Sequence, residues 1–344
     1  RDHKEILVKE ETDLLHFANK VARSVDQCVK QVRVVYSAKV QKVFTANTTG
    51  EATSEERVST LFLVNVVARE GDIIQTGYEP VAEARGFELL SKERVEDIAL
   101  KAATRAVNLV HAREAPSGQM SVVLSSRAGG TMIHEAVGHG LEADLAQEGL
   151  SVYSGKINEM VASKEISIID DATINSARGS FFYDDEGTEG QKTVLVENGV
   201  LKRYMYDRLT AMKDGVQSTG NGRRESYRFS PIPRMTNTLI VSGKSDPHDI
   251  ISSVDKGLLV LKMGGGQVDT VNGNFVFDIS EGYLLEKGQI GDMVRGATLI
   301  GNGPRVMRGI DMIGTDLGFG VGTCGKDAQG VPVSDAQPTL RIPH

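Results

Sequence analysis

The larger, C-terminal part of this chain consists of short apolar and β-branched runs separated by glycine, and this pattern limits the folds open to it. Runs such as NTLIVSG and NFVFDIS recur beyond Gly118, and most of the 37 glycines of the chain lie among them. Because glycine permits tight turns and positive φ, the pattern favours many short strands over long helices. Strands at this spacing predict a β-barrel or sandwich, with one short helix near residue 134.

The N-terminal part shows a different order of elements. Apolar residues recur at intervals of three and four up to Val32, which predicts an amphipathic helix with Cys28 on its buried stripe. Residues 33–44 and 57–68 are rich in valine, leucine and aromatic side chains and predict two strands joined by a loop. Ser91 then begins a second helix. The predicted order of elements in the N-terminal part is therefore α-β-β-α.

The break at residues 115–118, APSG, is the predicted domain boundary. A chain of 344 residues exceeds the usual size of a single core, so two domains are expected. The predicted fold class is α+β. An N-terminal α/β domain covers residues 1–114 and is expected to be incomplete, and a β-rich, barrel-like domain with one metal-binding helix covers residues 115–344.

Charge and cysteine content exclude several classes of protein. The net charge of −7 opposes attraction to a phosphate backbone, so we expect no nucleic-acid partner. No window approaches the ~18 apolar residues of a membrane span, so we expect no membrane partner either. Two distant cysteines, Cys28 and Cys324, are compatible with a reducing compartment, and the cytoplasm is the expected location.

The segment HEAVGH, from His134 to His139, is the strongest chemical signal in the chain. The zinc-peptidase motif HExxH places two histidines four residues apart on one helical face. Here the spacing is five, which at ~100° per residue turns the second imidazole about 140° away on an ideal α-helix. Local π-type winding would bring the rings together, and Gly138 and Gly140 lower the cost of leaving α geometry.

The spacing alone is a weak signal, because an isolated HExxxH string also occurs on surface helices. A catalytic zinc needs three protein ligands and one open position. Cys324 is the best third candidate, since it lies among glycines in what the sequence predicts to be a turning loop, although a lone cysteine is also a common buried hydrophobe. A thiolate with His134 and His139 favours Zn²⁺, and Glu135 would then act as the catalytic base.

The glycine run of Gly264, Gly265 and Gly266 lacks the residues of a phosphate-binding loop, so we exclude nucleotide binding. It is expected either to form a flexible turn or to let the backbone approach an extended substrate peptide. The two interpretations are equally supported by the sequence.

Arg223 and Arg224 follow Asn221 in a polar, glycine-containing segment. Their guanidinium groups could bind a substrate carboxylate or an oxyanion, and the alternative is a solvated loop or an ion pair with Glu225. Residues 184–186, DDE, do not reproduce the alternating ligands of an EF-hand and are expected to form a charged loop.

Several motifs in this order resemble those of one family. They are HEAVGHGLEADL, NGRRESYRFSPIPRMTNT, GGGQVD, GATLIGNG and CGKDAQGVPV. Together they resemble the TldD/PmbA family of metallopeptidases, earlier described as modulators of DNA gyrase. Within that family the chain resembles the TldD branch, because the PmbA (TldE) branch lacks the metal motif.

The resemblance implies that His134, His139 and Cys324 bind zinc and that Glu135 is the catalytic carboxylate. It also implies an N-terminal α/β domain, a barrel-like C-terminal domain, and a dimer, commonly of TldD with its metal-free paralogue. Family members carry a further segment before the residue where this chain begins and a short tail after its last residue.

The leading hypothesis is therefore a cytoplasmic zinc peptidase that hydrolyses unfolded or flexible polypeptides, either as a homodimer or as a heterodimer with a metal-free paralogue. The alternative is a partner-dependent regulatory protein whose metal site is structural. A structural zinc has four protein ligands, whereas a catalytic zinc keeps one position open.

Overall fold

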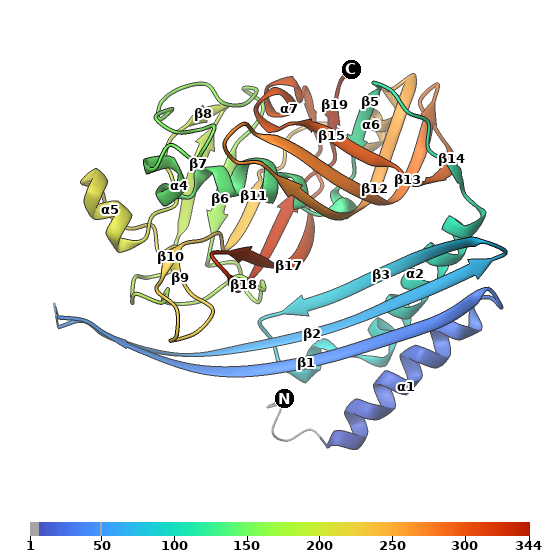
Figure 1. Ribbon diagram of the computed structural model, residues 1–344, viewed down its shortest axis with the longest axis horizontal. Helices are drawn as coiled ribbons and strands as arrows, with labels where there is room; N and C mark the ends of the chain where they lie inside the picture. Colours follow the sequence, from blue (N-terminus) through green and yellow to red (C-terminus); the bar gives the residue numbers. More distant parts are fainter. Residues whose placement is uncertain (1–6, 49) are drawn as a thin grey trace. The chain divides into compact units, whose positions relative to one another are not determined.

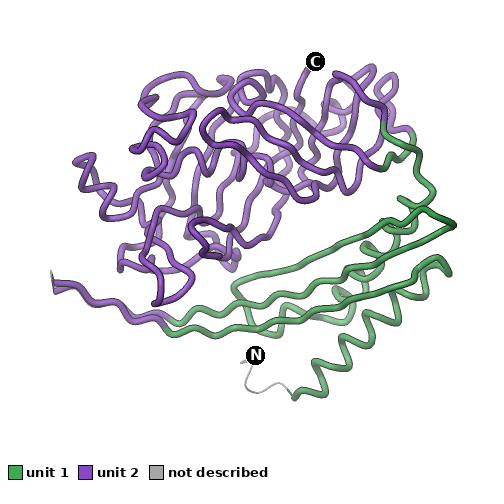
Figure 2. Tube along the Cα trace, in the orientation of Figure 1, with its two compact units in different colours: residues 1–42, 56–115, 292–295 green, residues 43–55, 116–291, 296–344 purple. Residues whose placement is uncertain are grey.

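The computed structural model describes residues 7–48 and 50–344 of the chain. These residues divide into two compact units (Figure 2). The N-terminal unit comprises the chain up to Lys42 together with Glu56–Ala115 and Asp292–Arg295. The C-terminal unit comprises Val43–Glu55, Pro116–Gly291 and Gly296–His344.

Two helices and a three-stranded sheet form the N-terminal unit (Figure 1). Its elements are α1 (Val8–Ser24), β1 (Val29–Ala46), β2 (Ala52–Glu70), β3 (Ile73–Glu83), η2 (Phe87–Leu89), α2 (Lys92–His111) and β4 (Arg113–Glu114). The end of β1 from Val43 on and the start of β2 up to Glu55 are assigned to the C-terminal unit. The sheet order is β1-β2-β3. In β2 every second side chain from Phe62 to Ala68 is buried, and these side chains share one core with Ala18 of α1 and Ile98 of α2. Period-two burial places both helices on one face of the sheet.

Two predictions about this unit were wrong in detail. The order is α-β-β-β-α, because β3 forms although Gly77 and Pro80 weaken its strand pattern. Its place at the sheet edge tolerates a proline. The first helix ends at Ser24, so Cys28 is buried in the turn that precedes β1 and not on a helical stripe. The second helix begins after Ser91, whose side chain accepts a hydrogen bond from the Arg94 amide, as predicted.

The C-terminal unit is rich in strands and contains more helices than the sequence predicts. Its elements are β5 (Ser121–Leu124), η3 (Ser126–Ala128), α3 (Thr131–Ile133), η4 (His134–Gly138), η5 (His139–Leu141), α4 (Ala143–Gln147), β6 (Ile168–Asp171), β7 (Lys192–Glu197), β8 (Val200–Leu201), α5 (Arg208–Asp214), β9 (Gly222–Arg223), β10 (Ile232–Pro233), β11 (Asn237–Ile240), α6 (Pro247–Ser252), β12 (Lys256–Val268), β13 (Asn274–Glu286), β15 (Thr298–Asn302), α7 (Gly303–Gly309), β16 (Met312–Ile313), β17 (Gly318–Lys326), β18 (Gln329–Gln337) and β19 (Leu340–Ile342). Strand β14 (Gln289–Arg295) is divided between the two units.

The strands of the C-terminal unit form two open sheets. One has the order β17-β18-β11-β6-β7-β8, and the other contains β16-β19-β5-β12-β13 with β15 paired to β13. Neither closes on itself within the described residues, so the expectation of a barrel was wrong. Short strands separated by glycine suit open sheets equally well, and the two-residue strands β8 and β16 end these sheets at one side.

The segment Thr131–Gly138 packs between the two sheets, against β11 and β18 on one side and β12 and β13 on the other. It is the part of the C-terminal unit that the sequence singled out for its chemistry. The fold therefore places this segment in the interior of the unit, where side chains from both sheets can approach it.

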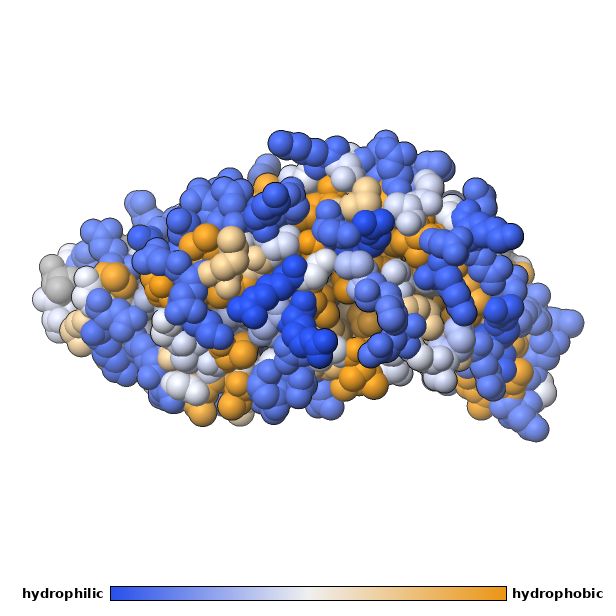
Figure 3. All heavy atoms as spheres, turned by 90° about the horizontal axis from the view of Figure 1, so that it is seen from above, coloured by the Kyte–Doolittle hydropathy of each residue, from blue (hydrophilic) through white to orange (hydrophobic). Residues whose placement is uncertain are grey.

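On the face of the molecule drawn in Figure 3, hydrophilic residues predominate and hydrophobic residues form small groups between them. Among the described residues, no helix combines the length and apolarity that a membrane span requires.

Candidate metal centre

The helical segment that carries the two histidines winds as a π-helix. Hydrogen bonding of the π type runs from His134 to Gly138, followed by a 3₁₀ turn at His139–Leu141, so the predicted π-type winding is confirmed. The wider turn compensates for the five-residue spacing. Gly138 itself has ordinary helical angles, φ −53° and ψ −55°. It is needed for packing, because a Cβ there would lie 2.1 Å from the Sδ of the buried Met235.

Cys324 lies in strand β17 and not in a turning loop, which corrects the prediction. Strand β17 pairs antiparallel with β18, and Cys324 is opposite Val331. The glycines at 318, 320 and 322 alternate along the strand, which explains why the segment resembles a loop in the sequence. The side chain of Cys324 is buried, and the buried Arg234 donates a hydrogen bond to its main-chain oxygen.

The structure brings His134, His139 and Cys324 together. Their ligand atoms all lie within 4.8 Å of one another. The Sγ of Cys324 is 3.4 Å from the Nε2 of His139. The centroids of the His134 and His139 imidazole rings are 5.1 Å apart, and the ring planes meet at 88°. A strand from one sheet thus meets a helical turn nearly two hundred residues earlier in the chain.

This donor set suits a zinc ion. Two imidazoles and a thiolate are the ligands that zinc prefers, and three of them leave one position for a reactant. The Nδ1 of His134 is buried and has no hydrogen-bond partner in the described structure. A buried polar atom without a partner is unfavourable, and a bound cation is one way in which such a cluster is satisfied.

The side chains of this cluster shift one another's pKa values. Burial alone would raise the pKa of the Cys324 thiol, but hydrogen bonds from His134 and His139 outweigh it and lower the pKa to about 5. Burial alone would lower the pKa of His139, but the Glu142 and Cys324 side chains raise it well above its usual value.

Glu135 lies next to this cluster and is only partly exposed. Burial raises the pKa of its carboxyl, and the charges of His134 and His139 act in the opposite direction. A carboxylate whose pKa is raised toward neutrality is a more effective base near neutral pH than an exposed one.

The two arginines proposed as substrate contacts differ in their environment. The Arg223 side chain is buried and donates to the main-chain oxygens of Met235 and Pro332. These contacts favour a role in joining strands over contact with substrate. Arg224 is partly exposed, and its guanidinium makes a long hydrogen bond, 3.5 Å, to the main-chain oxygen of Phe229.

The acidic segment at 184–186 is more ordered than a solvated loop. Asp184 is buried and accepts hydrogen bonds from the main-chain amides of Glu186, Thr188 and Gly222. Asp185 is buried as well and accepts from the amide of Arg224. These carboxylates fix the segment that carries the two arginines.

The glycine run lies at a β-bulge in β12. Met263 pairs with Ile279 and Gly266 pairs with Phe277, so Gly264 and Gly265 together lie opposite the single residue Asp278, and β12 has one extra residue here. β12 pairs with β5 only from Gly257 to Val260. At Gly264, Gly265 and Gly266, no described strand pairs with β12 on the edge that faces away from β13.

Two residues near the metal centre were not predicted from the sequence. Glu142 is fully buried and its Oε2 is 3.0 Å from the Nδ1 of His139. Lys326 is nearly buried and its Nζ is 3.1 Å from the same oxygen. Each lies within three residues of a predicted ligand, and this proximity in the sequence was the only signal that could have found them.

Comparison with known proteins identifies the family. Residues 117–344 match the PmbA/TldA metallopeptidase C-terminal domain and residues 1–110 match the central domain. A metalloprotease TldD homologue from Buchnera aphidicola is 43% identical over 97% of this chain and 71% of its own length. The chain belongs to the TldD family of metallopeptidases.

Three further proteins are similar to this chain. A zinc metalloprotease TldD homologue from Saccharolobus solfataricus is 29% identical over 97% of this chain and 75% of that protein. The crystal structure of a putative modulator of a DNA gyrase from Thermotoga maritima superposes with a TM-score of 0.80 at 26% identity, covering 98% of this chain and 75% of that one. TldE from Thermococcus kodakarensis, at 21% identity, a TM-score of 0.73 and coverage of 97% and 74%, shares the fold.

Proposed function

We propose that this chain is a zinc-dependent peptidase that hydrolyses peptide bonds in unfolded or flexible polypeptides. The convergence of His134, His139 and Cys324 beside the partly buried Glu135 carries the proposal. These three side chains would hold the zinc ion. When bound, zinc supplies Lewis acidity toward a peptide carbonyl.

Glu135 performs the proton transfers in this proposal. Its carboxylate accepts a proton from the attacking water as the oxygen of that water bonds to the carbonyl carbon. It then delivers the proton to the amide nitrogen as the carbon–nitrogen bond breaks, which yields a carboxylic acid and an amine. The raised pKa of Glu135 supports both steps, since the group must hold a proton between them.

Substrate binding is proposed at Gly264, Gly265 and Gly266, on the edge of β12 that no described strand pairs with at these residues. An extended peptide can add to such an edge through main-chain hydrogen bonds with little sequence preference. This mode requires a substrate segment that is not already in a folded structure. We further propose that the protein acts in the cytoplasm as a dimer, either of identical chains or with a metal-free paralogue.

The test compares wild-type protein with the Glu135→Gln variant on a casein-like unfolded substrate. We expect the variant to retain one zinc ion per chain by elemental analysis, because no ligand is changed. We expect cleavage to fall about 100- to 10,000-fold, the usual contribution of a general base. Cleavage by Glu135→Gln at the wild-type rate would show that Glu135 is not the general base. Wild-type protein that binds zinc without cleaving any peptide would favour the alternative, a regulatory protein with a structural metal.

A further inference from the structure

We propose that the buried Glu142–Lys326 ion pair positions the ligands of the metal centre: Glu142 orients His139, and Lys326 ties Glu142 to the strand that carries Cys324. The inference rests on the zinc site of the proposed function and concerns how the chain assembles that site.

Glu142 determines which nitrogen of His139 is available as a ligand. A carboxylate only accepts hydrogen bonds, so the His139 Nδ1 at 3.0 Å from Glu142 Oε2 must carry the proton. In the neutral ring the free lone pair is then on Nε2. Nε2 is the atom that lies 3.4 Å from the Sγ of Cys324. The hydrogen bond therefore directs the coordinating nitrogen of His139 toward the other ligands.

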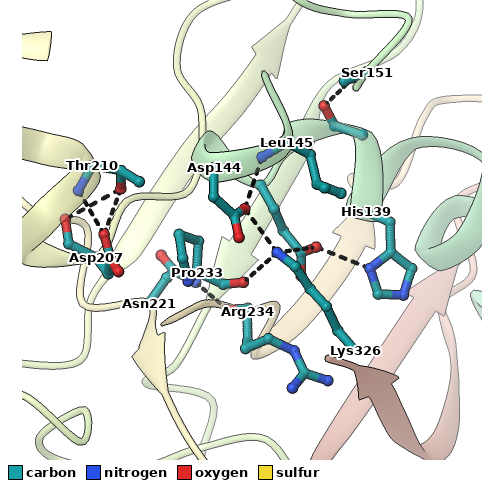
Figure 4. A network of polar contacts seen from close by, with 12 residues as sticks. His139, Asp144, Leu145, Ser151, Asp207, Thr210, Asn221, Pro233, Arg234 and Lys326 are labelled. Atoms are coloured by element: carbon teal, nitrogen blue, oxygen red, sulfur yellow. Dashed lines mark hydrogen bonds and ion pairs between the residues drawn. The ribbon is translucent and has the colours of Figure 1, made fainter. Parts of the chain in front are cut away.

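Lys326 joins this carboxylate to the second ligand-bearing segment. It follows Cys324 by two residues in β17, and alternate residues of a strand lie on the same face. Its Nζ is 3.1 Å from Glu142 Oε2 and 2.7 Å from Asp144 Oδ1, and it also donates to the main-chain oxygen of Pro233. Figure 4 shows the Lys326 side chain reaching toward Asp144, with His139 beside it.

Stability alone does not account for this pair. The Glu142 side chain is 0% exposed and that of Lys326 8%. A buried ion pair loses hydration that its attraction often fails to repay. In addition, the second carboxylate oxygen of Glu142, Oε1, is buried and has no hydrogen-bond partner in the described structure. Apolar side chains of similar size would avoid these costs, whereas only an acceptor in this place can fix the ring of His139.

The experiment measures metal binding in the full chain without reference to catalysis. Zinc affinity is determined by competition with a chromophoric chelator, and the cobalt-substituted protein reports ligand geometry through its visible and thiolate charge-transfer bands. The variants are Glu142→Leu, Glu142→Gln, and Glu142→Leu combined with Lys326→Met. Asp207→Asn is the matched control, since it neutralises a buried carboxylate that caps α5 and contacts no ligand.

We expect Glu142→Leu to lower zinc affinity about 10- to 100-fold and to alter the cobalt bands, as the loss of a ligand's hydrogen-bond partner does. Glu142→Gln keeps an acceptor and should recover part of the affinity. The double variant removes both charges, so it should fold even if Glu142→Leu does not, and it should show the same loss. Asp207→Asn should match wild type.

Wild-type affinity and spectra in a folded Glu142→Leu or double variant would overturn the proposal and leave the peptidase assignment untouched. Conversely, wild-type protein that binds zinc in this way but cleaves no peptide would overturn the peptidase assignment and leave the positioning role of Glu142 in place.

Discussion

At the scale of single residues, the two cysteines of this chain have opposite chemistry although both are buried and free. Burial raises the pKa of the Cys28 thiol, and hydrogen bonding to Asp26 adds to the effect. At Cys324, burial is outweighed by hydrogen bonds from His134 and His139, which lower the pKa to about 5. Because the thiolate is the form that binds metals, its lowered pKa suits Cys324 to the proposed ligand role at neutral pH, whereas the raised pKa of Cys28 does not.

This difference predicts the pH dependence of the metal-stripped protein. The ultraviolet absorbance of thiolate should rise through a transition near pH 5, be lost in Cys324→Ser and persist in Cys28→Ser. The folded pKa lies below that of the unfolded thiol. The thiolate therefore contributes stability that is full above the unfolded pKa and is lost as pH falls through 5. A Cys324 transition near the ordinary thiol pKa would contradict the hydrogen bonding described.

Sequence reasoning finds residues that belong to a contiguous motif and misses those that only the fold brings near. His134, Glu135 and His139 are adjacent or one turn apart, so local helical geometry was enough to relate them. Cys324 was related to them by its glycine-rich surroundings and by family resemblance. Lys326 was missed although it is two residues from Cys324, because its partner Glu142 is far away in the sequence and a lysine is ordinarily a solvated residue.

At the scale of elements, two of the errors arise because glycine and valine patterns in the sequence are ambiguous. Alternating glycines made β17 resemble a loop, although strand pairing with β18 satisfies its backbone. Valines at helical spacing extended the first helix beyond Ser24, where β1 in fact begins a few residues later. The π-turn was predicted correctly because two histidines that must meet one ion restrict the backbone to few conformations.

The bulge in β12 offers a matched pair of substitutions. A Cβ at Gly265 has no atom within 4 Å, whereas one at Gly266 would lie 1.9 Å from the ring of the buried Phe277. We expect Gly266→Ala to lower the free energy of unfolding by about 1–3 kcal/mol through overpacking. Gly265→Val should leave stability within ~0.5 kcal/mol of wild type and raise KM for a peptide several-fold by crowding the substrate strand.

Chemical denaturation and steady-state kinetics on a peptide substrate separate the two effects. An unchanged KM in Gly265→Val would exclude the bulge from substrate binding. If Gly265→Val lowered the free energy of unfolding as much as Gly266→Ala does, Gly265 would also be a packing residue.

At the scale of the whole molecule, net charge favours a peptidase over a nucleic-acid-binding protein. Acidic residues outnumber basic ones by 46 to 39, and this balance opposes binding to a polyanion. We expect no saturable binding of duplex DNA in fluorescence anisotropy at physiological salt. Tight binding that weakens steeply as salt increases would instead indicate a basic surface that the net charge conceals.

The candidate metal centre also depends on the completion of the C-terminal unit. Its histidines lie in the first helical turns of that unit, and Cys324 lies close to its end, in the strand that pairs with β18. During synthesis on the ribosome, a nascent chain therefore carries both imidazoles long before it carries the thiol. If the three side chains hold zinc as proposed, the site cannot form until the strand that carries Cys324 has been synthesised.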